Sequence, residues 1–283
     1  VRQSTQTLGE ATRCVHIGDR ESDIYELFSE CESQTTKFVF RTCVNRRSGE
    51  GEQTVTKMMK NQRVQAVHRV EVRDREGKPT SALLELKYHR LQICPSVEKQ
   101  KRDPNLTLTV IHAQERGQPQ DRDPIDWKLI TNLPVRNKAE VIEKLDWYSL
   151  RWKIETFHKI LKSGCRAEDS KLRTAQRLAN LIAILCIVAW RVLWLTMVNR
   201  CSPNLPAQLV FTETEIQLLD HLVPMKDGSQ GKTIGPYIIR LARLGGYLNR
   251  TRDAPPGNMV LWRGMTRLTD IHLGFNLARI VGH

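Results

Sequence analysis

The sequence contains no CxxC pair, no internal repeat and no low-complexity stretch. Its seven cysteines are odd in number and widely scattered, which argues against a zinc knuckle or a disulfide framework. Such a pattern is typical of reduced thiols in the cytoplasm, where we expect the protein to reside. The first residues include a basic side chain but no apolar run after it, so we also expect no signal peptide.

Acidic residues are scarce relative to basic ones. The chain of 283 residues has 44 Lys and Arg against 31 Asp and Glu, a formal net charge of +13, and its isoelectric point is near 9.6. An excess of this size indicates a polyanionic partner, either nucleic acid or an acidic membrane surface. The alternative at this point is a soluble protein that is merely basic.

Long hydrophobic runs are also scarce, and residues 181–198 are the exception (LIAILCIVAWRVLWLTMV). This run is long enough to be weighed as a membrane span. However, Arg191 lies near its middle and no second run accompanies it. We therefore predict a buried helix of a large core and no membrane partner.

The remaining pattern predicts an α/β beginning, a β-rich middle and a helical end. Residues 12–18 read as a strand that ends at Asp19, residues 19–31 as a helix and residues 37–44 as a second strand. Residues 62–131 contain four or five segments with the alternation of strands, which predicts an antiparallel meander inserted into the α/β frame. Helices are predicted near 138–145, 147–162, 170–198, 211–223, 234–250 and 254–280.

One segment, residues 146–164 (DWYSLRWKIETFHKILKSG), carries a charged stripe. At about 100° per residue, six polar side chains fall within a sector of roughly 100° on a single helix. These are Tyr148, Arg151, Glu155, His158, Lys159 and Lys162. Apolar side chains occupy a separate sector, namely Leu150, Ile154, Phe157 and Leu161. The pattern predicts a core helix whose exposed edge binds an anion.

Two carboxylates are candidates for metal chemistry. Asp19 stands at the carboxyl end of a predicted strand, where α/β folds commonly place phosphate or metal chemistry. Glu155 stands among basic groups that could pair with phosphates. Together the two could bind Mg²⁺, which prefers oxygen ligands. Each signal alone is weak, because an Asp after a strand is often a cap and a helical Glu beside Arg or Lys often forms an exposed ion pair.

The spacing of four of these residues is more specific. Tyr148, Arg151, Glu155 and Lys162 match the Y-R-E-K signature of bacterial insertion-sequence DDE transposases of the IS-four family, the group of the Tn-five transposase. Other segments of the chain also resemble that family, namely IGDRESDIYELF, KFVFRTCVNRR, IDWKLITNLPV and, near the end, IIRLARLGGYLNR with LWRGMTRL. The resemblance extends from about residue 13 to residue 275.

The resemblance implies a role for each matching residue. Asp19 and Glu155 resemble the second and third carboxylates of the DDE triad and would be ligands of Mg²⁺ or Mn²⁺. Tyr148, Arg151 and Lys162 resemble the residues that position phosphates at the transposon end, with His158 and Lys159 in support. Trp127 matches a tryptophan that stacks on a base flipped from the duplex, although its residue pattern alone favours a core tryptophan.

Basic turns add further candidates for DNA contact. Arg41, Arg46 and Arg47 lie in or beside the segment 45–51 (NRRSGEG), and a second basic loop covers 96–105. Solvated charged turns that bind nothing are an equally good reading of both segments.

The fold implied is an RNase H-like catalytic domain, incomplete at its N-terminus and interrupted by a β-rich insertion. We assign residues 1–47 and 135–202 to this domain, 48–134 to the insertion and 203–283 to a helical region for dimerisation. Residues 239–250 are the candidate dimer surface, with ordinary helix packing as the alternative.

The function implied is cut-and-paste DNA transposition by a homodimer in a synaptic complex, acting on double-stranded DNA at transposon ends and on target DNA, in the nucleoid of a bacterial cytoplasm. The family's first catalytic aspartate lies upstream of the point where this chain begins. Asp23 is a poor substitute, because it would lie one turn beyond Asp19 inside the predicted helix. We therefore expect a fragment that is inactive alone. The alternatives are a non-catalytic DNA-binding remnant or inhibitor, and another RNase H-like nuclease.

Overall fold

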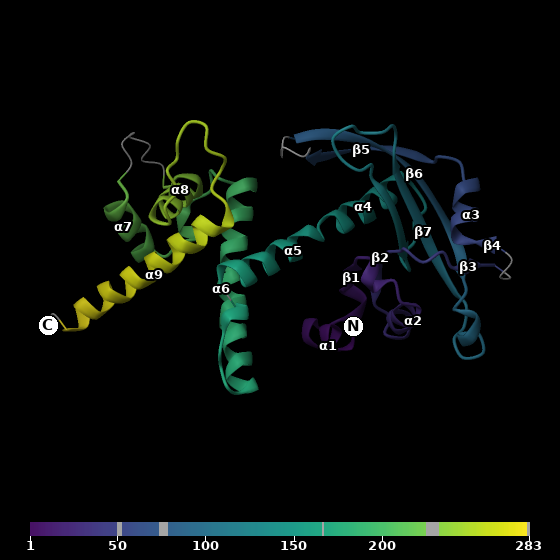
Figure 1. The fold of residues 1–283 in the computed structure, drawn as a ribbon, viewed down its shortest axis with the longest axis horizontal. Coiled ribbons are helices and arrows are strands. Elements are labelled where there is room, and N and C mark those ends of the chain that lie inside the picture. The colour runs from purple at the N-terminus through teal and green to yellow at the C-terminus, as the bar shows by residue number, and fades with distance from the viewer. Residues whose placement is uncertain (50–52, 74–78, 166, 225–231, 282–283) are drawn as a thin grey trace. The chain divides into compact units, whose positions relative to one another are not determined.

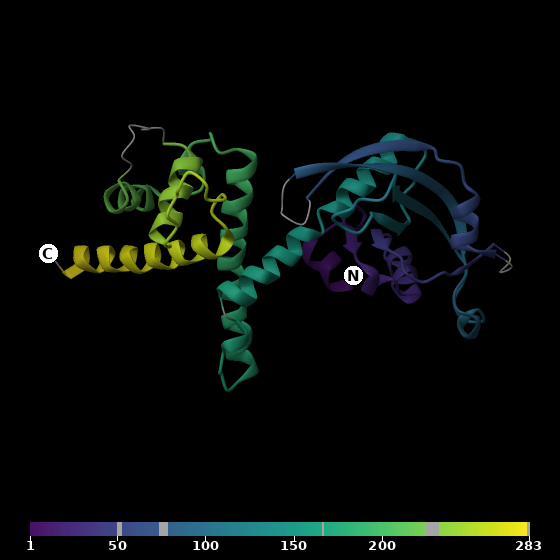
Figure 2. The same cartoon turned by 45° about the horizontal axis from the view of Figure 1, so that its top comes forward.

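The computed structural model describes residues 1–49, 53–73, 79–165, 167–224 and 232–281 (Figure 1). The chain divides into two compact units, Val1–Arg151 and Trp152–His283. The first unit contains the strands and the second is helical, as the two views in Figures 1 and 2 show. A mixed α/β region followed by a helical C-terminal region was predicted from the sequence, and this level of the prediction is confirmed.

The first unit is built on a mixed sheet in which eight strands are described, in the order β1-β2-β8-β7-β6-β3-β4 with β5 paired to β6. Its strands are β1 (Val15–Gly18), β2 (Lys37–Arg41), β3 (Arg47–Ser48), β4 (Gln53–Thr54), β5 (Ala66–Arg73), β6 (Pro79–Ile93), β7 (Leu106–Glu115) and β8 (Asp126–Thr131). β1 runs parallel to β2, and the β2–β8 and β8–β7 pairs are antiparallel.

Helices cover both faces of this sheet. They are α1 (Arg2–Leu8), α2 (Tyr25–Ser33), α3 (Val55–Asn61) and α4 (Lys138–Ser149), with short 3₁₀ turns at Ala11–Arg13, Arg20–Ser22 and Val97–Lys99. Successive side chains of a strand point to opposite faces. Phe38 and Phe40 therefore pack with α2 and α3 in one core, whereas Val39 packs with α4 in another.

The β-rich segment forms part of the same sheet as β1 and β2. Its four long strands were predicted, and they are present. The helix α3 was not predicted. It is only seven residues long, and its N-cap is Thr54, whose side chain accepts a hydrogen bond from the N–H of Lys57. The sequence also predicts a turn at residues 75–80 (REGKPT), and residues 75–78 of it lie outside the described residues.

The predicted helix at residues 19–31 is shorter than expected. The chain first makes the 3₁₀ turn Arg20–Ser22, and α2 begins only at Tyr25. Between them, the side chain of Asp23 accepts hydrogen bonds from the backbone of Cys43 and Val44. The backbone of Asp23, with φ −77° and ψ 60°, is not helical, so the prediction that Asp23 lies inside a helix is wrong.

The second unit packs its helices around one apolar core. The elements are α5 (Trp152–Lys159), a π-helical turn at Ile160–Gly164, 3₁₀ turns at Ala167–Asp169 and Ala207–Leu209, α6 (Ala175–Cys201), α7 (Glu213–Leu222), α8 (Ile234–Leu244) and α9 (Asn258–Val281). α8 and α9 approach so closely that a Cβ at Gly264 would collide with the carbonyl of Leu241. The helices predicted near 211–223, 234–250 and 254–280 are all present.

The candidate dimer surface at residues 239–250 takes part in this packing. Leu241 and Ala242 on α8 are fully buried in the core of the second unit. For these side chains the alternative of ordinary helix packing is confirmed, because a side chain buried inside its own unit cannot contact a second copy.

Burial of α6 differs from the prediction. Only its second half is buried, at Ala189, Val192, Leu195 and Thr196, whereas Ile184 and Ile187 in its first half are 60% and 70% exposed. The guanidinium of Arg191 is satisfied at 2.8 Å by both carboxylate oxygens of Glu215 on α7.

In the described part of the chain, α6 is the one helix that could cross a membrane by length and composition. Its second half instead contributes Ala189, Val192 and Leu195 to the core of the second unit. The expectation of a core helix therefore holds for that half alone.

Candidate active site

Asp19 is the centre of a polar cluster at the carboxyl end of β1. The hydroxyl of Tyr148 on α4 donates a hydrogen bond to Asp19 Oδ1 at 3.1 Å. Arg151 Nη2 lies 3.6 Å from Asp19 Oδ2, and Arg41 Nη1 at the end of β2 lies 4.0 Å from Oδ1. The side chain of Asp19 is 36% exposed, so an outside ligand can reach it. Four residues predicted as site residues are thus brought together in the first unit.

The surroundings of Asp19 favour its charged form. Partial burial acts to raise the pKa of Asp19, but the backbone N–H of Arg20, the charges of Arg151 and Arg41 and the hydroxyl of Tyr148 together outweigh it. The pKa of Asp19 therefore lies below its usual value. At neutral pH the group is a carboxylate, the form that binds a cation.

Tyr148 is held as a hydrogen-bond donor. Burial raises the pKa of its phenol, and the negative charge of Asp19 raises it further. Its ring is buried, with the guanidinium of Arg151 lying 5.9 Å from its centroid. The neutral phenol can donate to Asp19, which fixes the carboxylate against α4.

Trp127 on β8 lies next to this cluster. Its ring meets that of Tyr148 edge to face, with centroids 5.3 Å apart and an interplanar angle of 71°. Trp127 is half-buried, and it also lines a pocket of about 250 Å³ with residues of β5 and α4. The core reading and the stacking reading of Trp127 are both compatible with this position, because one part of the indole packs inward and another borders open space.

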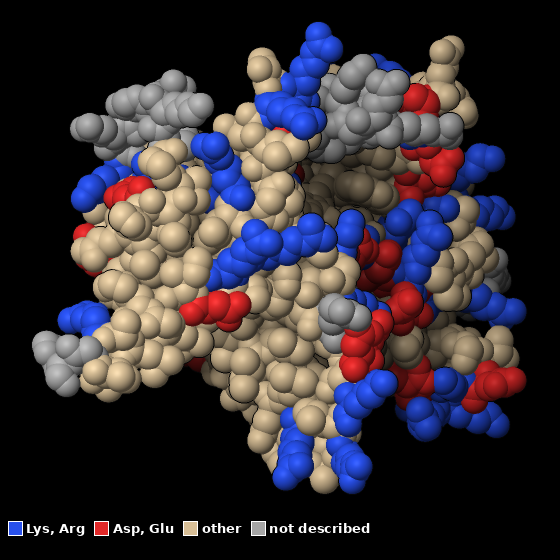
Figure 3. All heavy atoms as spheres, turned by 60° about the vertical axis from the view of Figure 1, so that its left-hand side comes forward, with Lys and Arg blue, Asp and Glu red and all other residues tan. Residues whose placement is uncertain are grey.

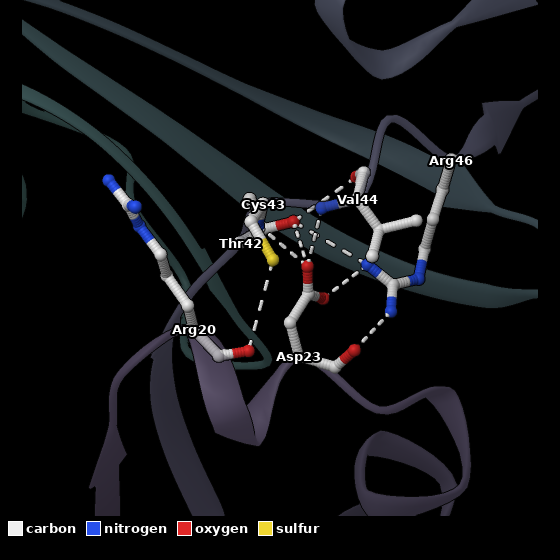
Figure 4. Close-up of polar contacts among 6 residues, drawn as sticks. All are labelled: Arg20, Asp23, Thr42, Cys43, Val44 and Arg46. Carbon is white, nitrogen blue, oxygen red and sulfur yellow. Dashed lines mark hydrogen bonds and ion pairs between the residues drawn. The ribbon is translucent and has the colours of Figure 1, made fainter.

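Asp23 lies at the other end of the same 3₁₀ turn and faces a different partner set (Figure 4). Its Oδ2 accepts hydrogen bonds from the hydroxyl of Thr42 at 2.8 Å and from the N–H groups of Cys43 and Val44, both at 2.7 Å. Its Oδ1 pairs with Arg46, whose Nη2 also donates to the carbonyl of Asp23 at 2.8 Å. The clamp holds the turn after β2 in one conformation.

These contacts occupy the guanidinium of Arg46. Its side chain is 10% exposed, and it lies 5.0 Å from the ring centroid of Phe28 in the core. Arg46 therefore ties the turn to the sheet, and its buried, paired guanidinium argues against the predicted contact with DNA. Arg47, the next residue, is exposed on β3.

The charged stripe does not lie on one helix. α4 ends at Ser149, and α5 begins at Trp152. At the break, the N–H of Leu150 bonds to the carbonyl of Trp147, and that of Arg151 to that of Tyr148. These i to i−3 bonds tighten the helix end, so the prediction of one helix over 147–162 is wrong.

The second unit carries the other half of the stripe. Glu155, His158 and Lys159 lie on α5 and Lys162 lies on the π-helical turn, and all four are exposed. Lys162 Nζ is 3.1 Å from a carboxylate oxygen of Glu168. Lys159 lines a pocket of about 340 Å³ together with Arg200 on α6. The predicted apolar sector is only partly packed, since Leu150 and Ile154 are exposed while Phe157 and Leu161 contact the core.

The two predicted metal ligands fall in different units, Asp19 in the first and Glu155 in the second. Within the described residues there is no group of three His, Cys, Asp or Glu side chains that could hold a metal ion. The side chain of Asp19 is by itself a suitable ligand for a hard divalent cation, because it is an ionised and partly exposed oxygen donor.

Sequence reasoning missed two basic residues near Asp19. Arg20 follows it directly in the chain, and Lys128 follows Trp127 on β8. Both line one pocket with Arg41. Their positions next to predicted site residues were the available signal, but nothing in the sequence showed that the ends of β2 and β8 would bring them together.

Two family models match the chain. Residues 2–191 match a transposase DDE domain, and residues 187–282 match a Tn5 transposase dimerisation domain. The order of the matches agrees with the order of the units, a sheet with the Asp19 cluster followed by packed helices. The second match indicates a dimer, and the family as a whole acts on DNA with divalent metal ions. The chain belongs to the family of DDE transposases related to those of IS4 and Tn5.

Proposed function

We propose that this protein takes part in cut-and-paste DNA transposition, with Asp19 and Glu155 as two carboxylates of an RNase H-like catalytic centre. The observation that carries the proposal is the Asp19 cluster. An ionised carboxylate at a strand end is held by Tyr148 and flanked by Arg41 and Arg151, so a carboxylate and groups that pair with phosphate lie together.

A divalent cation, Mg²⁺ or Mn²⁺, would be held by Asp19 and Glu155. When bound, such a cation activates a water and stabilises the leaving oxygen of a phosphoryl transfer. The residues of this chain supply the rest. Tyr148 orients the Asp19 carboxylate, and Arg151 and Arg41 can each form paired hydrogen bonds with phosphate oxygens.

The exposed basic residues of the second unit would bind the transposon end. Lys159, Lys162 and His158 stand on one short segment with Glu155, and Lys is suited to phosphates as a compact point charge. Figure 3 shows Lys and Arg side chains, drawn in blue, beside broad areas of surface that carry no Lys, Arg, Asp or Glu. In the first unit, Arg47 is the exposed candidate.

Trp127 would stack on a base flipped out of the duplex. The pocket of about 250 Å³ that it lines is bordered by His68, Arg69, Leu145 and Asp146, which offers both an apolar wall and polar groups. Stacking on an aromatic ring contributes about 1–3 kcal/mol per base. The Trp127→Ala variant should bind a duplex with a mismatched, easily flipped base no better than a perfect duplex, while the unmodified protein prefers the former.

These 283 residues alone are proposed not to cut DNA. The open edge of β1 supports this, because within the described residues β1 pairs only with β2. A further strand that carries another carboxylate would fit beside Asp19 at that edge. Metal-dependent nicking of a transposon-end duplex by this chain, abolished by Glu155→Gln, would show the proposal to be wrong.

The function itself is tested in a chain extended upstream. If the coding sequence before Val1 supplies an aspartate on an additional strand, Glu155→Ala in that longer protein should abolish cleavage and leave end binding largely intact. An equal loss of binding would make Glu155 structural. A start codon close to residue 1 would instead favour a regulator that acts through mixed dimers, or a remnant, in keeping with the match to a dimerisation domain.

The second copy in a homodimer is proposed to cover the end of α9. The C-terminal half of α9 lies within the matched dimerisation domain. Its exposed apolar side chains are Leu273, Phe275, Leu277, Ile280 and Val281. The Leu277→Glu variant should be monomeric by light scattering, whereas a Leu8→Glu control, at an exposed leucine outside the matched dimerisation domain, should remain dimeric. A protein that acts on chromosomal DNA is expected at the bacterial nucleoid in the cytoplasm, and we propose no membrane partner.

A further inference from the structure

A small pocket lies beside the Asp19 cluster, entirely within the first unit. It has a volume of about 190 Å³ and lies between the end of β2 with the turn that follows, the start of α3 and the strand β8. Its lining residues are Arg20, Arg41, Thr42, Cys43, Val44, Asn45, Val55, Thr56, Asp126 and Lys128.

The pocket is strongly basic. Arg20, Arg41 and Lys128 contribute three positive charges, and Asp126 is the one acid that lines it. The carboxylate of Asp126 is already engaged at 2.7 Å by His112 Nε2. Across the described ranges, neither Arg20 nor Lys128 forms an ion pair or a side-chain hydrogen bond, so two cations face the pocket without compensation. A site of this kind attracts an anion.

The wall of the pocket is rigidly built. The clamp by Asp23 holds the hydroxyl of Thr42 and the backbone N–H groups of Cys43 and Val44, and the N–H of Asp23 also bonds to the carbonyl of Arg20. Figure 4 shows the side chain of Arg20 extending away from this clamp. The carboxylate of Asp23 is therefore fully engaged in the clamp. The guanidinium of Arg20 stays available to a ligand, and the backbone that carries it is already fixed.

Arg41 connects the pocket to Asp19. Its guanidinium donates to the carbonyl of Asp126 at 3.2 Å on the pocket side and lies 4.0 Å from Asp19 Oδ1 on the other. An anion in the pocket is thus one side chain away from the proposed catalytic carboxylate. Phosphates follow one another along a DNA strand. A strand with one phosphate in the pocket would therefore place the next phosphate near Arg41 and Asp19.

We propose that this pocket binds a backbone phosphate of the DNA strand that passes Asp19, with Arg20 and Lys128 as its ligands. Arg20 offers a planar fork of donors to two phosphate oxygens, and Lys128 on β8 offers a point charge. The inference rests on the proposed function, since it names a subsite for the DNA on which that function acts.

The test measures the salt dependence of DNA binding by fluorescence anisotropy, with a labelled duplex of mixed sequence and about 0.05–0.2 M salt. Neutralising one phosphate contact should flatten the slope of log K against log [salt] by about 0.9 and weaken binding roughly fivefold at about 0.15 M salt. The double variant Arg20→Gln/Lys128→Gln should show this change. The control Lys60→Gln/Lys138→Gln, which removes the same charge from exposed residues outside the pocket, should show a smaller one.

A second measurement separates DNA from a free anion. Inorganic pyrophosphate should not raise the melting temperature of the wild-type chain at millimolar concentration, because a single contact of this kind needs the rest of the DNA strand to hold it. A rise lost in the Arg20→Gln/Lys128→Gln variant, together with an unchanged DNA slope, would assign the pocket to a free phosphate and overturn the proposal. Equal slopes for the double variant and its control would also overturn it. Failure of the wild-type chain to bind any duplex would instead contradict the proposed function.

Discussion

Asp19 and Asp23 flank the same 3₁₀ turn, yet their surroundings are opposite in kind. The carboxylate of Asp23 is 1% exposed and has a close hydrogen-bond partner for each oxygen. The carboxylate of Asp19 is 36% exposed, and its two arginines stand at 3.6 and 4.0 Å, too far for direct hydrogen bonds. Asp23 is saturated by its own chain, whereas Asp19 keeps coordination capacity for something else.

The difference shows how one turn can serve structure and chemistry at once. Asp23 fixes the turn at Thr42–Val44, which directly follows Arg41, and Arg41 is a neighbour of Asp19. The buried ion pair of Asp23 and Arg46 thus supports the more exposed ion pair of Asp19 and Arg41. Each of the following predictions tests whether the two carboxylates are as different as their contacts indicate.

The largest effect is expected from Asp23→Ala. Removing one partner of a buried ion pair leaves Arg46 uncompensated, which typically costs about 3–5 kcal/mol of folding free energy. Denaturation in urea measures the loss. Asp23→Asn, which keeps part of the hydrogen bonding, should lose less. A cost under about 1 kcal/mol for Asp23→Ala would mean that the clamp is not important for stability.

Tyr148→Phe is expected to have a moderate effect. It removes the hydroxyl that bonds to Asp19 while keeping the buried ring, and such a bond contributes about 0.5–1.5 kcal/mol. The same change should raise the pKa of Asp19, since the hydroxyl is one of the groups that lower it. Carboxyl NMR titration of Asp19 checks the direction, and an unchanged or lower pKa would contradict the contact.

Asp19→Ala should change stability by less than about 1 kcal/mol, because its ion pairs are partly exposed. The variant should bind duplex DNA at least as tightly as the wild type, since a negative charge beside Arg41 and Arg151 is lost. If urea denaturation showed Asp19→Ala to be as costly as Asp23→Ala, the comparison between the two carboxylates would fail.

The smallest effect is a pH dependence. The pKa of Asp19 is lower in the folded chain than in the unfolded one, where it is about 3.9. Its contribution to stability is therefore fully present above that unfolded value and is lost as the pH falls through the lower folded value. On acidification across this window the wild type should lose slightly more stability than Asp19→Asn. Thermal melts of both proteins measure the difference, and parallel curves would argue against the shift.

Much of the fold was predictable because strand alternation is a strong local signal. Phe38, Val39 and Phe40 alternate between two cores, and the β-rich segment and the C-terminal helices were found by the same reasoning. The membership of that segment in the same sheet as β1 was not predictable, since it depends on the pairing of Val39 and Phe40 with Thr131 and Ile130, far along the chain.

The site was predictable in part. Spacing identified Tyr148 and Arg151, and the end of a predicted strand identified Asp19; the structure brings these three residues together. Helical periodicity could not detect the break after Ser149, because Leu150 keeps a helical backbone conformation there and a slight tightening leaves the apolar pattern intact. Neither could it show that Asp23 bonds to the turn after β2, since that contact joins residues about twenty positions apart.

The break between α4 and α5 has a consequence for how this sequence can vary. The boundary between the two units falls between Arg151 and Trp152, inside the signature that runs from Tyr148 to Lys162. Inserting or deleting one residue there would turn every later side chain by about 100° relative to Tyr148. The number of residues in this joint is therefore constrained by the signature residues on both of its sides.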